Sequence, residues 1–220
     1  MTYFSFFDRR NRSRLARVAG ALYLVIILCG VWSEGIARAQ LIVPGDAMAT
    51  ALAIAAAPGL LSLSVAADTV MACADVALAA VFLALLSTVQ PLLALIAAFF
   101  RLVQAALIGA GLVALAGAPA MFSAGEAQGM ALIGLHALAY DLGLVFFAVS
   151  CAAMAVLLAK AGTVPRPIYV GLALSALVYL TGSALRLFAP EQLAGFQTAY
   201  LIPLVSESAL CLWLLVTGRI

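Results

Sequence analysis

Apolar residues occur along the chain in six long stretches that are separated by short breaks. The stretches cover residues 15–38, 61–86, 92–116, 129–159, 167–188 and 198–218. Each is long enough for a transmembrane helix, which needs about 20 apolar residues. The breaks contain proline and glycine, for example Pro58-Gly59 and Gln90-Pro91, as expected where helices end. The pattern predicts an all-α membrane protein, a bundle of six transmembrane helices.

A shorter apolar run follows the first stretch. It covers residues 47–57 and comes directly after Asp46, a suitable N-cap residue. At about three helical turns it is too short to cross a bilayer, and we expect a short helix on the outer surface of the membrane. A seventh span through residues 47–65 is rejected, because Pro58-Gly59 would interrupt it and positive residues would move outside.

Composition supports a chain that lies almost entirely in the bilayer. Hydrophobic residues make up 67% of it and charged residues 9%, against about 45–50% and 25% in soluble proteins. The 220 residues leave no room for a separate soluble domain. We expect a basic cytoplasmic N-terminal segment over residues 1–14 and one six-helix domain over residues 15–220. The net charge of +2 without a long basic patch argues against a nucleic-acid partner.

Lysine and arginine are concentrated on one side of this topology. Positive residues are retained in the cytoplasm, so both termini should be cytoplasmic. Of the other arginines, Arg38 falls in an outside loop region, and Arg101 and Arg186 fall within spans. Eight of the 11 basic residues lie on the predicted cytoplasmic side: Arg9, Arg10, Arg12, Arg14, Arg17, Lys160, Arg166 and Arg219.

An alternative for the first stretch is a cleaved signal peptide. A basic start and an apolar run precede Ala37-Arg38-Ala39, which has the A-x-A pattern of a cleavage site. The long apolar run and the nearby Glu34 favour a retained span instead. Cleavage would leave five spans and an outside N-terminus.

The four cysteines and the aromatic residues suggest packing roles. Cys29, Cys73, Cys151 and Cys211 all lie inside apolar stretches without a CxxC pair, so we expect small core residues rather than disulfides or a thiolate metal site. The aromatic side chains expected at the membrane interface or in helix packing are Trp32, Trp213, Tyr23, Tyr179 and Tyr200.

Eight ionisable residues lie inside the predicted spans and are the main candidates for function. A charge near a helix centre costs about 2.5–3.5 kcal/mol on insertion scales, so these side chains should face inward and pair. We expect Arg101 to neutralise Asp75 or Asp141, and Glu34 to pair with Arg38 or Arg186. Five acids against two arginines leave an excess that must be protonated, bound to a cation or hydrated. The eight are Glu34, Asp68, Asp75, Arg101, His136, Asp141, Arg186 and Glu207.

Their depth predicts two polar layers that converge on a cavity open to the outside. With a rise of about 1.5 Å per residue, Asp75, Arg101 and Asp141 fall near the midplane. The inner layer, a predicted ligand site, contains Asp75, Arg101, Gln104, Tyr140 and Asp141. The outer layer contains Glu34, Asp68, His136, Arg186 and Glu207.

A metal site and the common catalytic motifs find little support. The single histidine excludes a three-histidine zinc site, and only a mixed site of His136, Asp68 and Glu207 is compatible with the predicted depths. The chain has no HExxH, no GxSxG and no glycine-rich phosphate loop. No cofactor is predicted, although a divalent metal fits the mixed site.

Several segments resemble a known family. These are residues 41–46 (LIVPGD), 99–105 (FFRLVQA) and 140–147 (YDLGLVFF), together with Asp68, Asp75, His136, Glu207 and Trp213. They are similar to a bacterial family of multi-pass membrane proteins, the DUF4386 domain of unknown function, from about Arg14 to Trp213. The resemblance implies a helical bundle in the bacterial inner membrane and supplies no activity.

Three classes of function remain open. The first is binding or transport of a small polar or cationic solute, or of protons, at the mid-depth layer; the chain is small for a transporter, and a homodimer could supply a second half. The second is an intramembrane enzyme for a lipid-like substrate, using Asp68, His136 and Glu207 as metal ligands or as acid and base. The third is a structural or sensory subunit whose ion pairs only fix helix register.

Overall fold

The computed structural model describes residues 9–220, and the regular secondary structure within them is entirely helical. Six helices are long and apolar enough to cross a membrane, which confirms the predicted six-span bundle. Of the predicted segment 1–14, residues 1–8 lie outside the described residues. The first span is α1 (Arg9–Trp32), continued by a π-helical turn η1 (Ser33–Arg38) and α2 (Ala39–Leu41). The others are α4 (Pro58–Leu86), α5 (Pro91–Phe122), α6 (Glu126–Ala161), α7 (Arg166–Phe188) and α9 (Leu201–Thr217).

The helix ends coincide with the proline and glycine breaks in the sequence. Pro58 and Pro91 are the first residues of α4 and α5. Proline is favourable at this position, because the backbone N–H that it lacks would form no hydrogen bond within the helix. After α6 and α9, Gly162 and Gly218 have φ angles of 68° and 61°. Glycine adopts this left-handed conformation without a steric penalty, so it ends both helices.

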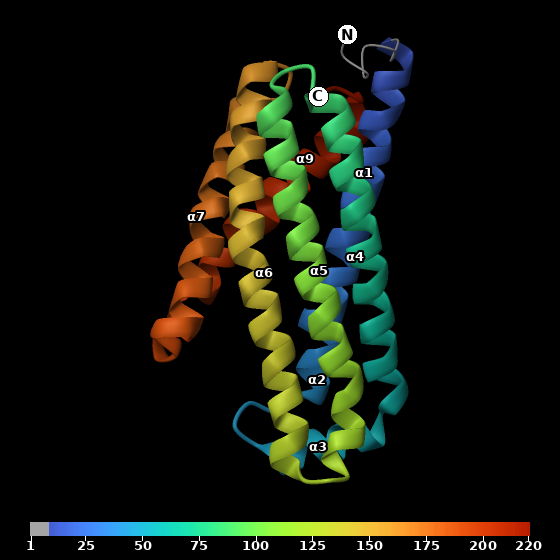
Figure 1. The fold of residues 1–220 in the computed structure, drawn as a ribbon, viewed down its shortest axis with the longest axis vertical. Helices are drawn as coiled ribbons and strands as arrows, with labels where there is room; N and C mark the ends of the chain where they lie inside the picture. Colours follow the sequence, from blue (N-terminus) through green and yellow to red (C-terminus); the bar gives the residue numbers. More distant parts are fainter. Residues whose placement is uncertain (1–8) are drawn as a thin grey trace.

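The short apolar run forms a helix, α3 (Ala47–Ala56). Asp46 caps it as expected, because its Oδ1 accepts a hydrogen bond of 2.8 Å from the backbone N–H of Ala49. The helix packs against α4, α5 and α6, at the end of the bundle opposite the C-terminus (Figure 1). Its position at the membrane surface stays a prediction.

The six long helices form a closed ring. Each packs against the next along the chain, and α9 packs against both α7 and α1. The start of α1 and the C-terminus lie at the same end, called here the termini end (Figure 1). Helix α7 has 23 residues and α6 has 36, so α6 continues well beyond α7 toward the opposite end (Figure 1). A short connection joins α7 to α9 through η2 (Pro190–Gln192), α8 (Leu193–Phe196) and η3 (Gln197–Tyr200).

The apolar core is divided along the bundle. One large cluster contains Tyr23, Leu158 and Leu214 near the termini end, and a second contains Ile54 and Ile133 near the opposite end. A third, smaller cluster contains Phe147 of α6 and Ala176 of α7. Large apolar side chains also cover the outside of the ring, as expected for a multi-pass protein whose outer surface contacts lipid.

The cysteines follow the prediction with one exception. All four are free, and Cys151 and Cys211 are buried while Cys29 is partly buried. Cys73 is exposed, so its expected place in the core is wrong. It lines an open groove between α4 and α5 instead of packing in the core.

Candidate functional site

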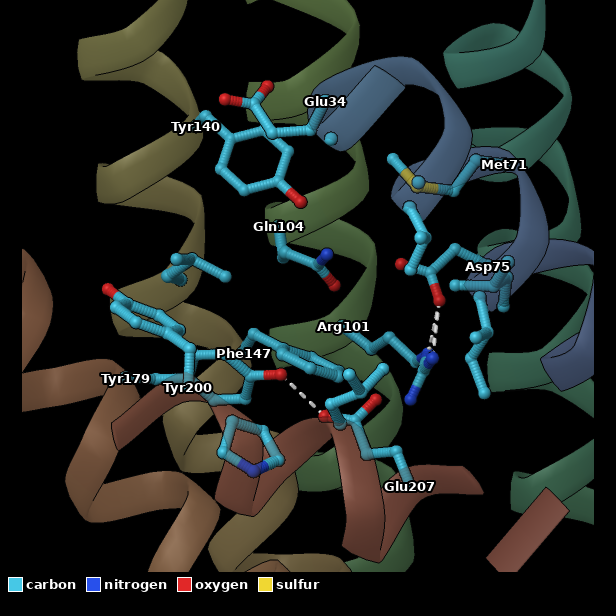
Figure 2. Close-up of a pocket in the computed structure, with 18 residues that line it drawn as sticks. Glu34, Met71, Asp75, Arg101, Gln104, Tyr140, Phe147, Tyr179, Tyr200 and Glu207 are labelled. Atoms are coloured by element: carbon cyan, nitrogen blue, oxygen red, sulfur yellow. Dashed lines mark hydrogen bonds and ion pairs between the residues drawn. The ribbon is translucent and has the colours of Figure 1, made fainter. Parts of the chain in front are cut away.

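A cavity of about 360 Å³ lies inside the ring, and all six long spans contribute to its wall. Its volume is in the range of small-molecule sites. Figure 2 shows polar side chains from several helices projecting into it. Its lining residues are Ile26, Ile27, Gly30, Val31, Glu34, Gly35, Met71, Asp75, Arg101, Gln104, Tyr140, Leu144, Phe147, Tyr179, Tyr200, Pro203, Leu204 and Glu207.

Arg101 and Asp75 form a buried ion pair in the cavity wall. Arg101 Nε donates a hydrogen bond of 2.7 Å to Asp75 Oδ1, and Arg101 Nη2 lies 2.5 Å from the same oxygen. The guanidinium carbon is 5.2 Å from the ring centre of Tyr23 and 4.9 Å from that of Phe147. One of the two predicted pairings of Arg101 is therefore confirmed. Its charge is neutralised by Asp75 and its position is fixed by two aromatic faces.

Glu207 is a buried acid without such a partner. The Tyr179 hydroxyl donates a hydrogen bond of 2.6 Å to Glu207 Oε1 (Figure 2), and only 7% of the residue is exposed. Among the described residues, Glu207 forms no ion pair.

The depth of Glu207 follows from its position in α9. Glu207 lies ten residues before Thr217, the last residue of α9, and Arg101 lies ten residues after Pro91, the first residue of α5. The two side chains are thus at similar depth, about 15 Å from the termini end, which corrects the predicted outer-half position of Glu207.

Gln104 offers a second acceptor in the cavity. Its side chain projects into the space between Tyr140 and Arg101 (Figure 2). Its Oε1 is buried and has no hydrogen-bond partner among residues 9–220. Buried polar atoms in proteins are almost always paired, so this carbonyl oxygen is available to a ligand that donates a hydrogen bond.

Four of the five residues of the predicted inner layer line the cavity, and Asp141 does not. Asp141 forms an ion pair with Arg186. Asp141 lies 20 residues before Ala161, where α6 ends, and Arg186 lies 20 residues after Arg166, where α7 begins. The two side chains are therefore at the same depth. The midplane position expected for Asp141 is therefore wrong. The error arose because α6 extends far beyond α7, which places the middle of α6 away from the middle of the bundle.

Arg38 lies within the first span and not in a loop region, which corrects the sequence prediction. It is 3% exposed and belongs to the π-helical turn η1. It contacts Glu34 at 2.7 Å and Asp68 at 2.5 Å, and it also donates to Ser64 Oγ at 2.8 Å. The predicted pairing of Glu34 with Arg38 is confirmed. With this third arginine, four of the five in-span acids have a basic partner.

The members of the predicted outer layer do not form one layer. Glu34 and Glu207 line the cavity, whereas Asp68 and Arg186 are held in ion pairs away from it. His136 is 4% exposed, and its Nδ1 has no hydrogen-bond partner in the part of the chain that the structure describes. It packs close to Gly111 of α5 and does not line the cavity.

The mixed metal site of His136, Asp68 and Glu207 is not assembled. Within residues 9–220, no group of three or more His, Cys, Asp or Glu side chains is placed to hold a metal ion. Asp68 is instead bound to Arg38 on one side of the bundle, and Glu207 is bound to Tyr179 on another.

Sequence reasoning missed the aromatic wall of the cavity. Tyr179 and Tyr200, which were expected to be packing or interface residues, line it together with Phe147. The ring centre of Tyr179 lies 5.3 Å from that of Phe147 and 6.2 Å from that of Tyr200. Helical spacing could have identified part of this wall, because Tyr140 and Phe147 are two helical turns apart, as are Tyr200 and Glu207.

The cavity falls within the part of the chain that matches a protein family. The model of the family described as domain of unknown function (DUF4386) matches residues 18–218. The chain belongs to the DUF4386 family. The match includes every residue that lines the cavity. No curated protein and no solved structure matches the chain.

Proposed function

We propose that this DUF4386 protein binds and transports a small cationic or polar solute, or protons, through the central cavity. The observation that carries the proposal is Glu207, a buried acid at mid-depth that has no ion-pair partner among the described residues. An unpaired carboxyl group in the membrane interior is costly and is commonly part of an ion or proton pathway. We place the protein in the bacterial inner membrane with both termini in the cytoplasm.

The charge of the cavity wall supports a positively charged ligand. Glu34, Asp75 and Glu207 supply three carboxyl groups, and Arg101 supplies the one guanidinium group. The formal charge of these four groups is −2 when all are ionised. Arg38 does not cancel the excess, because it contacts Asp68 as well as Glu34. A proton or a cation at Glu207 would reduce the imbalance.

The other two classes of function have weaker support. The enzyme hypothesis relied on His136, Asp68 and Glu207 acting together, and these residues are not placed as one group. A purely structural role would explain Asp75 with Arg101 and Asp141 with Arg186, since these are matched pairs. It gives no reason for an unpaired acid beside an open cavity.

The proposal can be tested in proteoliposomes that contain a pH-sensitive dye. A potassium diffusion potential, negative inside, drives cations inward, and radiolabelled ethylammonium is then added to matched vesicles. The wild type should acidify the lumen or accumulate ethylammonium, and Glu207→Gln should do neither. The variant removes the charge and keeps a carbonyl oxygen that accepts from Tyr179.

A matched control is Glu191→Gln, the same chemical change in η2, outside the cavity wall. This variant should behave as the wild type. Equal activity of wild type and Glu207→Gln, or no proton or ethylammonium influx in the wild type, would contradict the proposal.

A further inference from the structure

The first and last spans separate on one side of the cavity. Near the termini end α1 and α9 are in close contact, since a Cβ atom on Gly20 would lie 2.8 Å from Leu215 Cγ. Farther along, a Cβ atom on Gly35 would meet no atom of the described residues within 4 Å. The tilt of α9 away from α1 is visible in Figure 1. The cavity therefore has a gap between two neighbouring helices rather than a complete wall.

Exposure of the lining residues locates this gap. Asp75, Arg101, Gln104 and Glu207, deep in the cavity, are each at most 7% exposed. By contrast, Val31 on α1 is 50% exposed and Leu204 on α9 is 42% exposed. Glu34 and Gly35 are exposed as well. We call the gap bounded by Val31, Glu34, Gly35 and Leu204 the lateral opening.

The lateral opening combines apolar and acidic side chains. Val31 and Leu204 would contact the apolar part of a molecule that comes from the bilayer. The Glu34 side chain is 70% exposed. Glu34 lies about 25 Å along the helix from Arg17, at the usual rise per residue. This position is near the surface of the opposite leaflet, where the charged groups of amphipathic molecules gather.

The deep end of the cavity presents acceptors to a bound molecule. Within the described residues, Gln104 Oε1 has no hydrogen-bond partner, and the Glu207 carboxyl group accepts from the Tyr179 hydroxyl and forms no ion pair. An ammonium group has several N–H donors and a positive charge, so it would satisfy both acceptors and reduce the excess negative charge. The aromatic rings of Tyr179, Tyr200 and Phe147 offer favourable contacts to a cation and its alkyl substituents.

From these features we propose that the ligand is an amphipathic organic ammonium ion that reaches the cavity from the outer leaflet through the lateral opening. The proposal rests on the proposed function and specifies its substrate class and route. The ammonium group passes Glu34 and binds between Glu207 and Gln104, and the alkyl chain remains among the apolar residues of α1 and α9.

Stopped-flow fluorescence with the protein in lipid nanodiscs can test this inference. The probe is a dansyl-labelled hexylammonium ion, excited by energy transfer from tryptophan, and empty nanodiscs correct for its partition into lipid. The wild type should bind it, and hexylammonium should displace it much better than hexanol. Glu207→Gln should weaken binding about 10- to 100-fold, as expected for the loss of a charge-assisted contact.

The route is tested by two substitutions on the exposed side of α1. Val31→Phe narrows the lateral opening and should slow association severalfold. Leu28→Phe, on the same helix at a site that is 60% exposed and outside the cavity wall, should leave the rate unchanged. If Val31→Phe fails to fold, Gly35→Phe replaces it, since that position has open space.

Each contrary result has a separate meaning. Displacement by hexanol as effective as by hexylammonium would overturn the substrate class, and an unchanged association rate in folded Val31→Phe would overturn the route. If the wild type binds no alkylammonium but still shows Glu207-dependent influx of protons or ethylammonium, this inference fails and the proposed function stands. If the influx does not depend on Glu207, the proposed function itself fails.

Discussion

Tyr179 and Glu207 are joined by a hydrogen bond of 2.6 Å between α7 and α9, with the phenol as donor. The bond holds the carboxyl group at the cavity wall without neutralising it. A phenol stabilises a carboxylate less than an arginine does, so Glu207 stays available for a proton or a cation. The arrangement differs from that of Asp75, which is fully paired with Arg101.

The first prediction concerns this hydrogen bond. Tyr179→Phe keeps the ring and removes the donor, leaving a buried acid unsatisfied, and should cost about 1–3 kcal/mol of unfolding free energy. Denaturant titration in detergent measures the cost. Tyr169→Phe on the same helix is the control, and an equal effect of both substitutions would show that the bond has no specific role.

The second prediction separates packing from binding at Asp75 and Arg101. Arg101→Met leaves Asp75 buried without a partner and should cost about 3–5 kcal/mol. The double variant Asp75→Arg with Arg101→Asp restores opposite charges and should recover part of this stability. The double variant also moves the cation away from the ring of Phe147 and so changes the cavity wall. We therefore expect ammonium binding to be weaker than in the wild type even where stability is recovered. Full binding in the double variant would instead mean that the pair only fixes helix register.

The third prediction uses the unequal exposure of the two acids that contact Arg38. Asp68 is buried, with a side-chain exposure of 1%, whereas that of Glu34 is 70%. Asp68→Ala leaves Arg38 without its buried partner and should cost several kcal/mol, whereas Glu34→Ala should cost about 1 kcal/mol or less. Thermal unfolding of the two variants in one detergent compares them. Similar losses would argue against a buried pair at Asp68.

The fourth prediction concerns the close contact of α1 and α9. Gly20→Ala would place a methyl group 2.8 Å from Leu215 Cγ and 2.9 Å from the Leu215 backbone nitrogen, and should destabilise the bundle. Gly109→Ala lies where a Cβ meets nothing within 4 Å and should be neutral or stabilising by up to about 1 kcal/mol, the helix-propensity difference. The order of the two unfolding midpoints is the readout, and the reverse order would contradict the packing.

The fifth prediction is the orientation in the membrane. Single cysteines introduced at Arg219 and at Gln40, in a chain without its four native cysteines, should react with impermeant maleimide from opposite sides. If the termini are cytoplasmic, as we propose, position 219 should be protected in intact cells and position 40 should be labelled. Labelling of position 219 in intact cells would reverse the topology.

Much of the fold was predictable, because each helix that crosses a bilayer needs about 20 consecutive apolar residues. The lengths of the apolar stretches and the breaks at Pro58-Gly59 and Gln90-Pro91 were sufficient for the six spans, and Asp46 was recognised as a cap. The pair of Arg101 with Asp75 was one of the two pairings that the predicted depths allowed, and the structure confirms it.

The errors in the predicted site depended on the lengths and tilts of whole helices, which local sequence patterns do not encode. Asp141 was misplaced because α6 and α7 share one end of the bundle but have 36 and 23 residues. Arg38 was assigned to a loop region because the π-helical turn that extends the first span has no clear sequence signal. Tyr179 and Tyr200 reach the cavity because α7 and α9 complete the ring of helices, which is a tertiary feature.

The most direct test of the central claim is the reaction of Glu207 with a hydrophobic carbodiimide, which modifies protonated carboxyl groups within the membrane. Peptide mass spectrometry of protein in nanodiscs should find the adduct on Glu207 and little on the ion-paired Asp75 or Asp68. Hexylammonium should slow the modification, and hexanol should not. Modification of Asp75 with Glu207 untouched, or a rate on Glu207 that hexylammonium does not change, would contradict a cation site at this acid.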